Sequence, residues 1–300
     1  MTYGVAVAAR GALVLAAAAW PFVEPLLPAL RRVRVPVLPP DARAGGRPLT
    51  VLHVSDLHLL PRHTRRAAWV RALARLRPDL VVSTGDHVSS ARSIPLLLQT
   101  LGALTADGTP GVFVPGNNDY FSPVRPRPTS YLHDGPPRPR SIDLPWASTS
   151  RRLQDAGWTD VTHRRTVVEV AGTPVTVTGT DDAHLRRDRY DAVSGPVDGL
   201  GLGVTHTPQR SLLEAFAADG HALVLAGHTH GGQLRLPGLG PAVTNCDLER
   251  DRARGLSRLV PGSGAGGWLH VSAGLGTSPY LPVRLCCRPE ATLLTLVERT

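Results

Sequence analysis

Lysine is absent from the 300-residue chain, and cysteine and methionine are scarce, with three residues and one residue respectively. Three cysteines cannot form a disulfide framework, although the length allows a substantial hydrophobic core. All 33 basic residues are therefore Arg, and with 24 acidic residues they give a net charge of +9. The Arg, Ala, Gly and Pro bias is typical of high-GC coding, which weakens a functional interpretation of this charge. Nucleic acid, an anionic membrane surface and an anionic small substrate are all compatible with it.

Several common motifs and patterns are also missing. The chain contains no Gly-x-Ser-x-Gly sequence and no P-loop, the motifs typical of serine hydrolases and of many nucleotide-binding proteins. Its 30 Gly and 28 Pro follow no Gly-X-Y period, so the chain is not collagen-like. A hydrophobic content of 42% is too high for a disordered protein. These absences leave a folded domain whose chemistry depends on other residues.

Residues 1–45 differ in composition from the rest of the chain. Gly11–Val23 is an uncharged, mostly apolar run, and it is shorter than the roughly 20 residues that a spanning helix needs. The run fits a membrane-associated helix, a cleaved export signal or a helix packed on the domain. We expect residues 1–45 to form a membrane-proximal segment and residues 46–300 to form the main domain.

Arginine and proline follow the apolar run. Arg31, Arg32 and Arg34 come directly after it, and under the positive-inside rule they would keep the bulk of a membrane-anchored chain cytosolic. Val33–Pro40 is expected to be an extended lead-in. Membrane association, on a side that the sequence leaves open, is the predicted localisation; a cytoplasmic and an exported protein are the alternatives.

From residue 49 onward the pattern predicts an α/β fold. Apolar, β-branched runs alternate with helical spacing, and a polar cluster follows each run, where ligand sites of open α/β sheets form. Strands are predicted over 49–54, 80–82, 111–114, 202–205, 223–225, 268–272 and 293–297, an antiparallel pair over 167–170 and 175–178, and helices over 67–76, 94–104 and 211–217.

The polar clusters at the strand ends contain seven candidate metal ligands: Asp56, His58, Asp86, Asn117, His206, His228 and His230. On an extended segment, residues i and i+2 point the same way, so each Asp-x-His or His-x-His pair can face one point. Seven ligands suit two ions bridged by a carboxylate, and this mixed donor set suits Mn, Fe, Zn or Co. Two such ions are a known arrangement for phosphoester hydrolysis.

Taken together, these residues resemble the five motifs of the calcineurin-like metallophosphoesterase superfamily. The motifs are Ser55-Asp56-Leu57-His58, Gly85-Asp86, Gly116-Asn117-Asn118-Asp119, His206 and Gly227-His228-Thr229-His230. Each motif alone is a common turn or cap, whereas five in the family's order are specific. The later segments 181–184 and 272–276 resemble a bacterial branch of the family with an N-terminal membrane segment.

The resemblance implies a four-layer α/β/β/α sandwich with mixed sheets and two divalent metal ions (Mn, Fe, Zn or mixed). By analogy, Asp56, His58, Asp86 and His230 would hold the first metal. Asp86 would bridge to a second metal held by Asn117, His206 and His228. The implied enzyme hydrolyses a phosphate ester or pyrophosphate bond through a metal-bridging hydroxide.

Asn118 departs from the family pattern, which usually has His at this position to contact phosphate and help protonate the leaving group. An amide can donate a hydrogen bond but cannot deliver a proton near neutral pH. With Asn118 in this catalytic position, we expect the enzyme to rely on its metals alone or to prefer good leaving groups. Otherwise, His87 or His184 would take over the role of the missing histidine. Asp119 is expected mainly to shape the turn.

The substrate is expected to be a small or lipid-linked phosphate ester, because the apolar segment and the Arg31–Arg34 and Arg125–Arg140 clusters favour an anionic membrane or a lipid phosphate. A nuclease or a cyclic-nucleotide phosphodiesterase with the same site is the alternative, and nucleic acid is less favoured because aromatic residues are few. A scaffold without turnover would require a lost ligand. No protein partner is inferred. Cys246, Cys286 and Cys287 are expected to be buried or half-buried, and the adjacent pair is not expected to form a disulfide.

Overall fold

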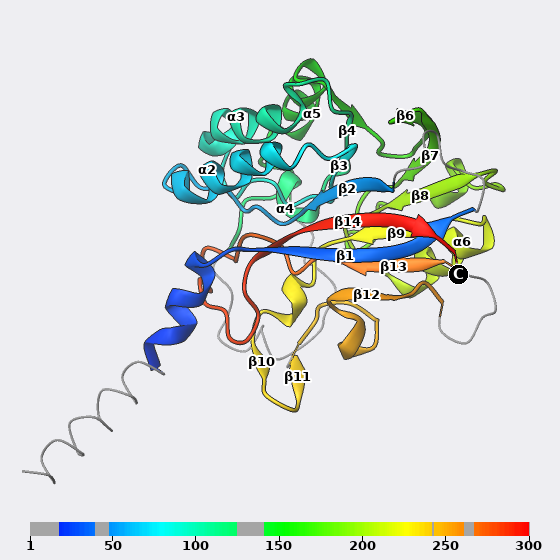
Figure 1. Cartoon of the computed structure of the whole chain (residues 1–300). Helices are drawn as coiled ribbons and strands as arrows, with labels where there is room; N and C mark the ends of the chain where they lie inside the picture. Colours follow the sequence, from blue (N-terminus) through cyan, green and yellow to red (C-terminus); the bar gives the residue numbers. More distant parts are fainter. Residues whose placement is uncertain (1–17, 40–47, 125–140, 242, 261–266, 300) are drawn as a thin grey trace, which may run out of the picture.

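Apolar runs in the sequence become strands of two six-stranded sheets, which lie face to face (Figure 1). The computed structural model describes residues 18–39, 48–124, 141–241, 243–260 and 267–299. The first sheet has the order β1-β14-β2-β3-β4-β5. Its strands are β1 (Ala29–Leu38), β2 (Leu49–Val54), β3 (Leu80–Ser83), β4 (Gly111–Phe113), β5 (Trp158–Asp160) and β14 (Glu290–Glu298). Neighbours pair in parallel except β14 and β2, so the sheet is mixed.

The second sheet is also mixed and has the order β12-β13-β9-β8-β7-β6. Its strands are β6 (Arg164–Val170), β7 (Thr173–Gly179), β8 (Leu200–Val204), β9 (Leu223–Ala226), β12 (Gly255–Arg258) and β13 (Trp268–Val271). The four central strands are parallel, while β6 and β12 run antiparallel at the two edges. A separate hairpin consists of β10 (Arg235–Leu236) and β11 (Gly240–Pro241).

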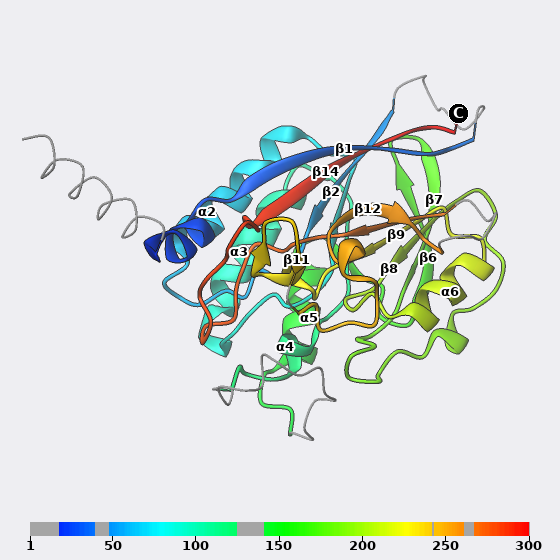
Figure 2. The ribbon, with the colours of Figure 1, turned by 90° about the horizontal axis from the view of Figure 1, so that it is seen from below.

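Helices cover the outer face of each sheet. The first sheet carries α2 (Thr64–Ala72), α3 (Ile94–Thr105) and α5 (Trp146–Asp155), and the second carries α6 (Arg210–Ala218). Figure 2 shows α2 and α3 on one side of the paired sheets and α6 on the other. A short helix, α4 (Asn117–Tyr120), follows β4, and single 3₁₀ turns lie at Glu24–Leu26, Leu73–Leu76, Ala91–Ser93, Tyr190–Ala192, His230–Gly232 and Arg250–Arg252.

Three apolar cores hold the four layers together. Valines and leucines such as Val51, Val82 and Leu202 fill the space between the sheets. A second core, which includes Leu101, lies under the helices of the first sheet, and a third surrounds Phe216 of α6. Because strands buried on both faces need apolar side chains on both sides, they appear in the sequence as continuous apolar runs. The α/β/β/α sandwich with mixed sheets is confirmed.

Most predicted elements are present, and the differences lie at the edges. The expected lead-in forms β1, which pairs in parallel with the C-terminal strand β14 and so becomes part of the first sheet. The strands β5 and β12 have only three and four residues, too short for a pattern in the sequence. The boundary at residue 45 stays a prediction, and the Arg125–Arg140 cluster lies outside the described residues. None of the described helices is long and apolar enough to cross a bilayer.

The cysteine prediction is wrong at one position. Cys246 is half-buried and Cys287 is buried, as predicted, but Cys286 is exposed. The backbone of Cys286 has a positive φ of 51°, and Cys287 takes the buried side of this turn. The adjacent pair does not form a disulfide, as expected.

The packing of α6 gives a test of the third core. Phe216 is fully buried, and Gly203 of β8 leaves room for its ring, since a Cβ there would lie 2.8 Å from the ring. We expect Phe216→Ala to lower the free energy of unfolding by about 3–5 kcal/mol through lost burial and a cavity. Val167→Ala, at a side chain that is 64% exposed, should change it by less than about 0.5 kcal/mol. Urea denaturation measures both; equal effects would show that α6 contributes little to stability.

Candidate metal centre

The candidate ligands lie where parallel strands of both sheets end side by side. Asp56 and Asp86 follow β2 and β3 of the first sheet, and His206 and His228 follow β8 and β9 of the second. Carboxyl ends of parallel strands share one edge of a sheet, and face-to-face packing brings the two edges together. Asp56 and His206 are fully buried and Asp86 is 2% exposed. The site is therefore enclosed by the two sheets.

The prediction that Asp56 and His58, like His228 and His230, lie on extended backbone is wrong. Both segments were expected to be extended, but all four residues have positive φ values of 42–71°. Asp86 shares this left-handed conformation, with φ of 54°. Such backbone costs a non-glycine residue about 1–2 kcal/mol and persists only where the surroundings impose it. Tight turns, and not strand alternation, aim these side chains.

Two glycines make the close approach of the loops sterically feasible. A Cβ on Gly116 would collide with Asp86 Oδ1, and a Cβ on Gly227 would collide with Ser55 Oγ and Asp56 Oδ2. Any side chain at either position would push a carboxylate out of the centre. The Gly residues in these two motifs are explained by this crowding.

Five of the seven candidate ligands form two overlapping groups. Asp56, His58 and His230 form one, and Asp56, Asp86 and His206 form the other; within each group the ligand atoms lie within 4.8 Å of one another. Asp86 faces both sides: its Oδ2 is 3.3 Å from His58 Nε2, and its Oδ1 is 3.5 Å from His206 Nε2. One carboxylate thus directs an oxygen to each of two imidazoles.

His228 joins the second group through a contact that requires either a shared proton or a metal ion. His206 Nδ1 lies 2.6 Å from the Thr84 carbonyl oxygen, and His228 Nε2 lies 3.0 Å from that of Asn245, so each of these nitrogens carries a proton and donates it. The remaining nitrogens, His206 Nε2 and His228 Nδ1, face each other at 3.2 Å. Two lone pairs at this distance repel unless a proton or a metal ion lies between them. The donor set therefore fits a bound divalent cation.

The first group shows a similar convergence of imidazole nitrogens. His58 Nε2 and His230 Nε2 are 3.1 Å apart, and His230 Nε2 lies 3.7 Å from Asp56 Oδ1. Burial lowers the pKa of both histidines, which favours the neutral form that binds metals. Asn117, the seventh candidate, is half-buried and begins α4 directly after Gly116.

The electrostatics separate the two carboxylates. Burial, with the Asp86 charge as a smaller contribution, raises the pKa of Asp56 to about 6. Burial would also raise the pKa of Asp86, but His206, His58 and the hydrogen bonds from Asn118 bring it below its usual range. Burial opposes a charge on His206, yet the nearby carboxylates raise its pKa to about 9. Asp86 is thus the carboxylate kept ionised at the centre.

Comparison with known proteins assigns the family. The sequence model of the calcineurin-like phosphoesterase family matches residues 49–232, which is more than half of the chain. The chain belongs to this family. It is similar to an uncharacterized metallophosphoesterase of Aquifex aeolicus, with 28% identity over 84% of this chain and 86% of that protein. It is also similar to the phosphodiesterase YaeI of Escherichia coli, with 27% identity over 84% of each chain.

A bovine transmembrane protein with a metallophosphoesterase domain is 27% identical over 90% of this chain and 57% of its own length. Family membership and the phosphodiesterase relative identify the chain as a hydrolase of phosphoester bonds. These comparisons establish neither the expected bacterial branch nor its N-terminal membrane segment.

A chain of hydrogen bonds that the sequence did not reveal fixes Asp56. Ser55 Oγ donates to Asp56 Oδ2 at 2.5 Å, and Thr84 Oγ1 donates to Ser55 Oγ at 2.6 Å. The only hydroxyl proton of Thr84 is then used, so His53 Nε2 donates to Thr84 Oγ1 at 2.9 Å. His53 Nδ1 must accept from His270 Nδ1, also at 2.9 Å, across the two sheets. Every donor points toward the Asp56 carboxylate.

The Gly116-Asn117-Asn118-Asp119 motif supports its loop in a way that the sequence partly predicted. Asn118 donates from its backbone and its side chain to the two oxygens of Asp86, both at 2.7 Å. Asp119 accepts from the backbone nitrogens of His87 and Gly116 and from His87 Nδ1, so it shapes the turn as expected. His87 is fully buried and stacks on Trp146. His87 therefore has a structural role in this loop.

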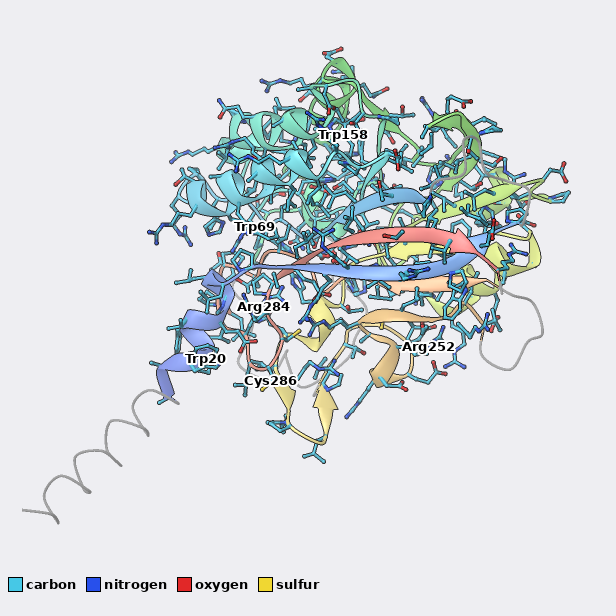
Figure 3. The ribbon with its side chains drawn as sticks, in the orientation of Figure 1. Trp20, Trp69, Trp158, Arg252, Arg284 and Cys286 are labelled. Atoms are coloured by element: carbon cyan, nitrogen blue, oxygen red, sulfur yellow. The ribbon has the colours of Figure 1, made fainter. Side chains whose placement is uncertain are left out.

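Two further residues near the ligands differ in how far the sequence pointed to them. His184 is half-buried, and its ring lies 4.8 Å from that of His228. Arg284 is fully buried beside His230 and donates to the carbonyls of Ala273 at 2.8 Å and Gly276 at 2.6 Å (Figure 3). The resemblance at 181–184 pointed to His184, whereas no motif in the sequence distinguishes Arg284 from the other arginines.

The Thr84 hydroxyl offers a test of the hydrogen-bond chain. We expect Thr84→Val to weaken Mn²⁺ binding about 10–100-fold, because the Ser55 and Asp56 side chains lose their fixed orientation. The Thr84 carbonyl that binds His206 remains in this variant. Isothermal titration calorimetry with Mn²⁺ measures the change.

The matched control is Thr178→Val, at a buried hydroxyl of β7 with no hydrogen-bond partner among the described residues. It should bind Mn²⁺ as the unmodified chain does. Equal affinities for both variants would exclude the proposed role of Thr84.

Proposed function

We propose that this chain is a dinuclear metal-dependent phosphoesterase. The observation that carries the proposal is the geometry of Asp86, whose two oxygens face imidazoles of two different ligand groups. Asp56, His58, Asp86 and His230 would hold one divalent ion. Asp86, Asn117, His206 and His228 would hold the other. Mn, Fe, Zn or a mixed pair suits these oxygen and nitrogen donors.

The residues around the candidate metal centre have separate roles in the proposed reaction. Two bound divalent ions would lower the pKa of a water molecule and offset the charge of the phosphoryl oxygens. Asp86 is held ionised between the ligand groups, and Asn118 orients it. Thr84 and Asn245 fix the tautomers of His206 and His228 so that a lone pair of each faces the site. The burial of the centre limits access of bulk water and strengthens its electrostatic interactions.

Asn118 sets the proposed leaving-group preference. Its amide is directed to Asp86 and has no proton to give near neutral pH. His87 is engaged by Asp119 and Ser83. Of the two histidines considered as substitutes, His87 and His184, it is His184 that lies beside the candidate ligands and is partly exposed. The enzyme is therefore proposed to favour esters with good leaving groups.

The proposed substrate is a small or lipid-linked phosphate ester or pyrophosphate near an anionic membrane. The apolar N-terminal run, the basic residues after it and the bovine transmembrane relative support this placement. A nuclease or a cyclic-nucleotide phosphodiesterase would use the same ligands, and its characteristic substrates belong in the test. Cytoplasmic and exported locations remain the alternatives for localisation.

Removing the central carboxylate tests the mechanism. Asp86→Ala should lower kcat by more than about 100-fold on phosphate monoesters, diesters and pyrophosphates with Mn²⁺, because even an outer-shell partner of a metal contributes 10–100-fold. Metal content per chain, measured by plasma mass spectrometry, should fall from two ions to at most one.

Asp219→Ala is the control, since this aspartate lies after α6 and binds Tyr190. It should keep both the activity and the metal content. Equal residual activity in Asp86→Ala would contradict the dinuclear proposal, and activity restricted to nucleic acid or cyclic nucleotides would favour the alternative.

Asn118→His tests the leaving-group preference. The imidazole should raise kcat on alkyl phosphates about tenfold or more relative to p-nitrophenyl phosphate, because general acid catalysis contributes 10²–10⁴-fold when well placed. Asn118→Ala removes the same hydrogen bond to Asp86 without adding a proton donor, and its ratio of the two rates should stay unchanged. A loss on every substrate, or the same ratio in both variants, would refute the assignment.

A further inference from the structure

Exposed apolar side chains gather on one part of the surface. Eleven large apolar residues are exposed in the described parts of the chain, and eight of them lie on three segments. The three segments are residues 18–27, the tip of the β10–β11 hairpin, and the loop that contains Tyr280. Leu239 and Leu26 are the most exposed, at 78% and 71%. The eight residues are Trp20, Phe22, Val23, Leu26, Leu27, Leu236, Leu239 and Tyr280; we call them the apolar rim.

Backbone contacts join these segments into one surface. Arg284 N donates to the Pro21 carbonyl at 2.8 Å, which fixes the N-terminal segment to the loop after Tyr280. Arg235 N donates to the Leu285 carbonyl at 2.9 Å, which fixes the hairpin to the next residue of that loop. Figures 1 and 3 show the N-terminal helical segment and the hairpin projecting on the same side, with Cys286 between them.

None of the three segments that form the apolar rim carries an exposed acidic side chain. Glu24 is the single acidic residue within 20–27, 234–241 and 278–288, and it is 2% exposed. Its carboxylate accepts from Cys286 N at 2.9 Å and from Cys287 N at 2.6 Å. Exposed Arg288 donates to the Leu27 carbonyl at 2.8 Å. The surface therefore combines protruding apolar groups with exposed positive charge.

We propose that the apolar rim docks on an anionic lipid bilayer. Its apolar groups lie on a hairpin tip and a helical segment, and protruding tips of Leu and Trp with flanking Arg are typical of segments that insert into a membrane interface. The apolar run of the sequence begins at Gly11 and ends within the rim at Val23, so the rim continues that run. Anionic lipid complements the Arg side chains, whereas it would be repelled by exposed carboxylates.

Docking in this way would place the metal centre at the membrane. His230 opens the turn that leads into the hairpin, and Arg284 of the rim loop lies 3.3 Å from His230 Nδ1. This substrate inference rests on the proposed function. A metal centre in this position would act on phosphoesters that lie at the level of the lipid headgroups. Membrane docking itself does not require that the substrate be a lipid.

The exposed thiol of Cys286 provides a local reporter. The full chain, with Cys246→Ser, is labelled at Cys286 with an environment-sensitive NBD fluorophore and mixed with phosphatidylcholine vesicles with or without 30% phosphatidylglycerol. We expect a blue shift and an intensity gain on the anionic vesicles. Vesicle-bound protein without a blue shift would overturn the proposal, because the rim would then face water.

A matched pair of variants assigns the contact to the hairpin. Leu239→Asp should weaken binding of the labelled chain to anionic vesicles at least about tenfold, whereas Val167→Asp, on the distant strand β6, should bind unchanged. Equal binding by both variants would refute a hairpin contact. A blue shift without vesicles that grows with protein concentration would show contact between copies of the chain, and would also overturn the proposal.

Activity on p-nitrophenyl phosphate separates this proposal from the previous one. Leu239→Asp should keep that activity, because it lies outside the metal centre. A chain that binds vesicles without hydrolysing phosphoesters would refute only the proposed function, and an active chain without vesicle binding would refute only the docking surface.

Discussion

Two buried carboxylates and four imidazoles converge where the two sheets meet, and this grouping requires positive charge to compensate it. Taking Asp56 and Asp86 out of water is unfavourable, and their mutual repulsion adds to that cost. His206 responds with a pKa raised to about 9, and Asp56 with one raised to about 6. A folded chain keeps such a cluster only when other parts of the structure hold it in place.

Several features of the surrounding structure hold the carboxylates and imidazoles in place. Glycines at 116 and 227 let backbone approach the carboxylates, and left-handed turns aim the side chains that follow the strands. The hydrogen-bond chain from His270 to Asp56 uses one histidine from each sheet, so it also ties the sheets together behind the site. Because the apolar core between the sheets fixes their relative position, the ligands of one sheet keep their distance from those of the other.

The periphery of the site connects to the N-terminal segment. Glu24 binds the backbone of Cys286 and Cys287. Arg284, in the same loop, donates to the carbonyl of Ala273 and lies 3.3 Å from His230 Nδ1. Residues far apart in the sequence thereby form one continuous support beneath the candidate ligand His230. This arrangement relates the metal centre to the apolar rim, and it gives the proposed membrane contact a structural connection to the proposed chemistry.

The sequence alone determined the layers of this protein and named its candidate metal ligands. Continuous apolar runs are required wherever a strand is buried on both faces. The strands observed at 49–54, 80–83 and 223–226 were therefore predicted to within one residue. The five motifs identified the family because metal ligands must be particular residue types. Short edge strands such as β5 could not be predicted, since three residues show no periodicity.

Tertiary structure alone decided how the candidate ligands are aimed. Asp56 and His58 meet through positive-φ turns that neighbouring loops impose, and not through the alternation of a strand. His53, Thr84 and Arg284 gained their roles from partners as far as 217 residues away, such as His270 for His53. No local pattern encodes a contact of that kind, because it exists only after the two sheets have packed.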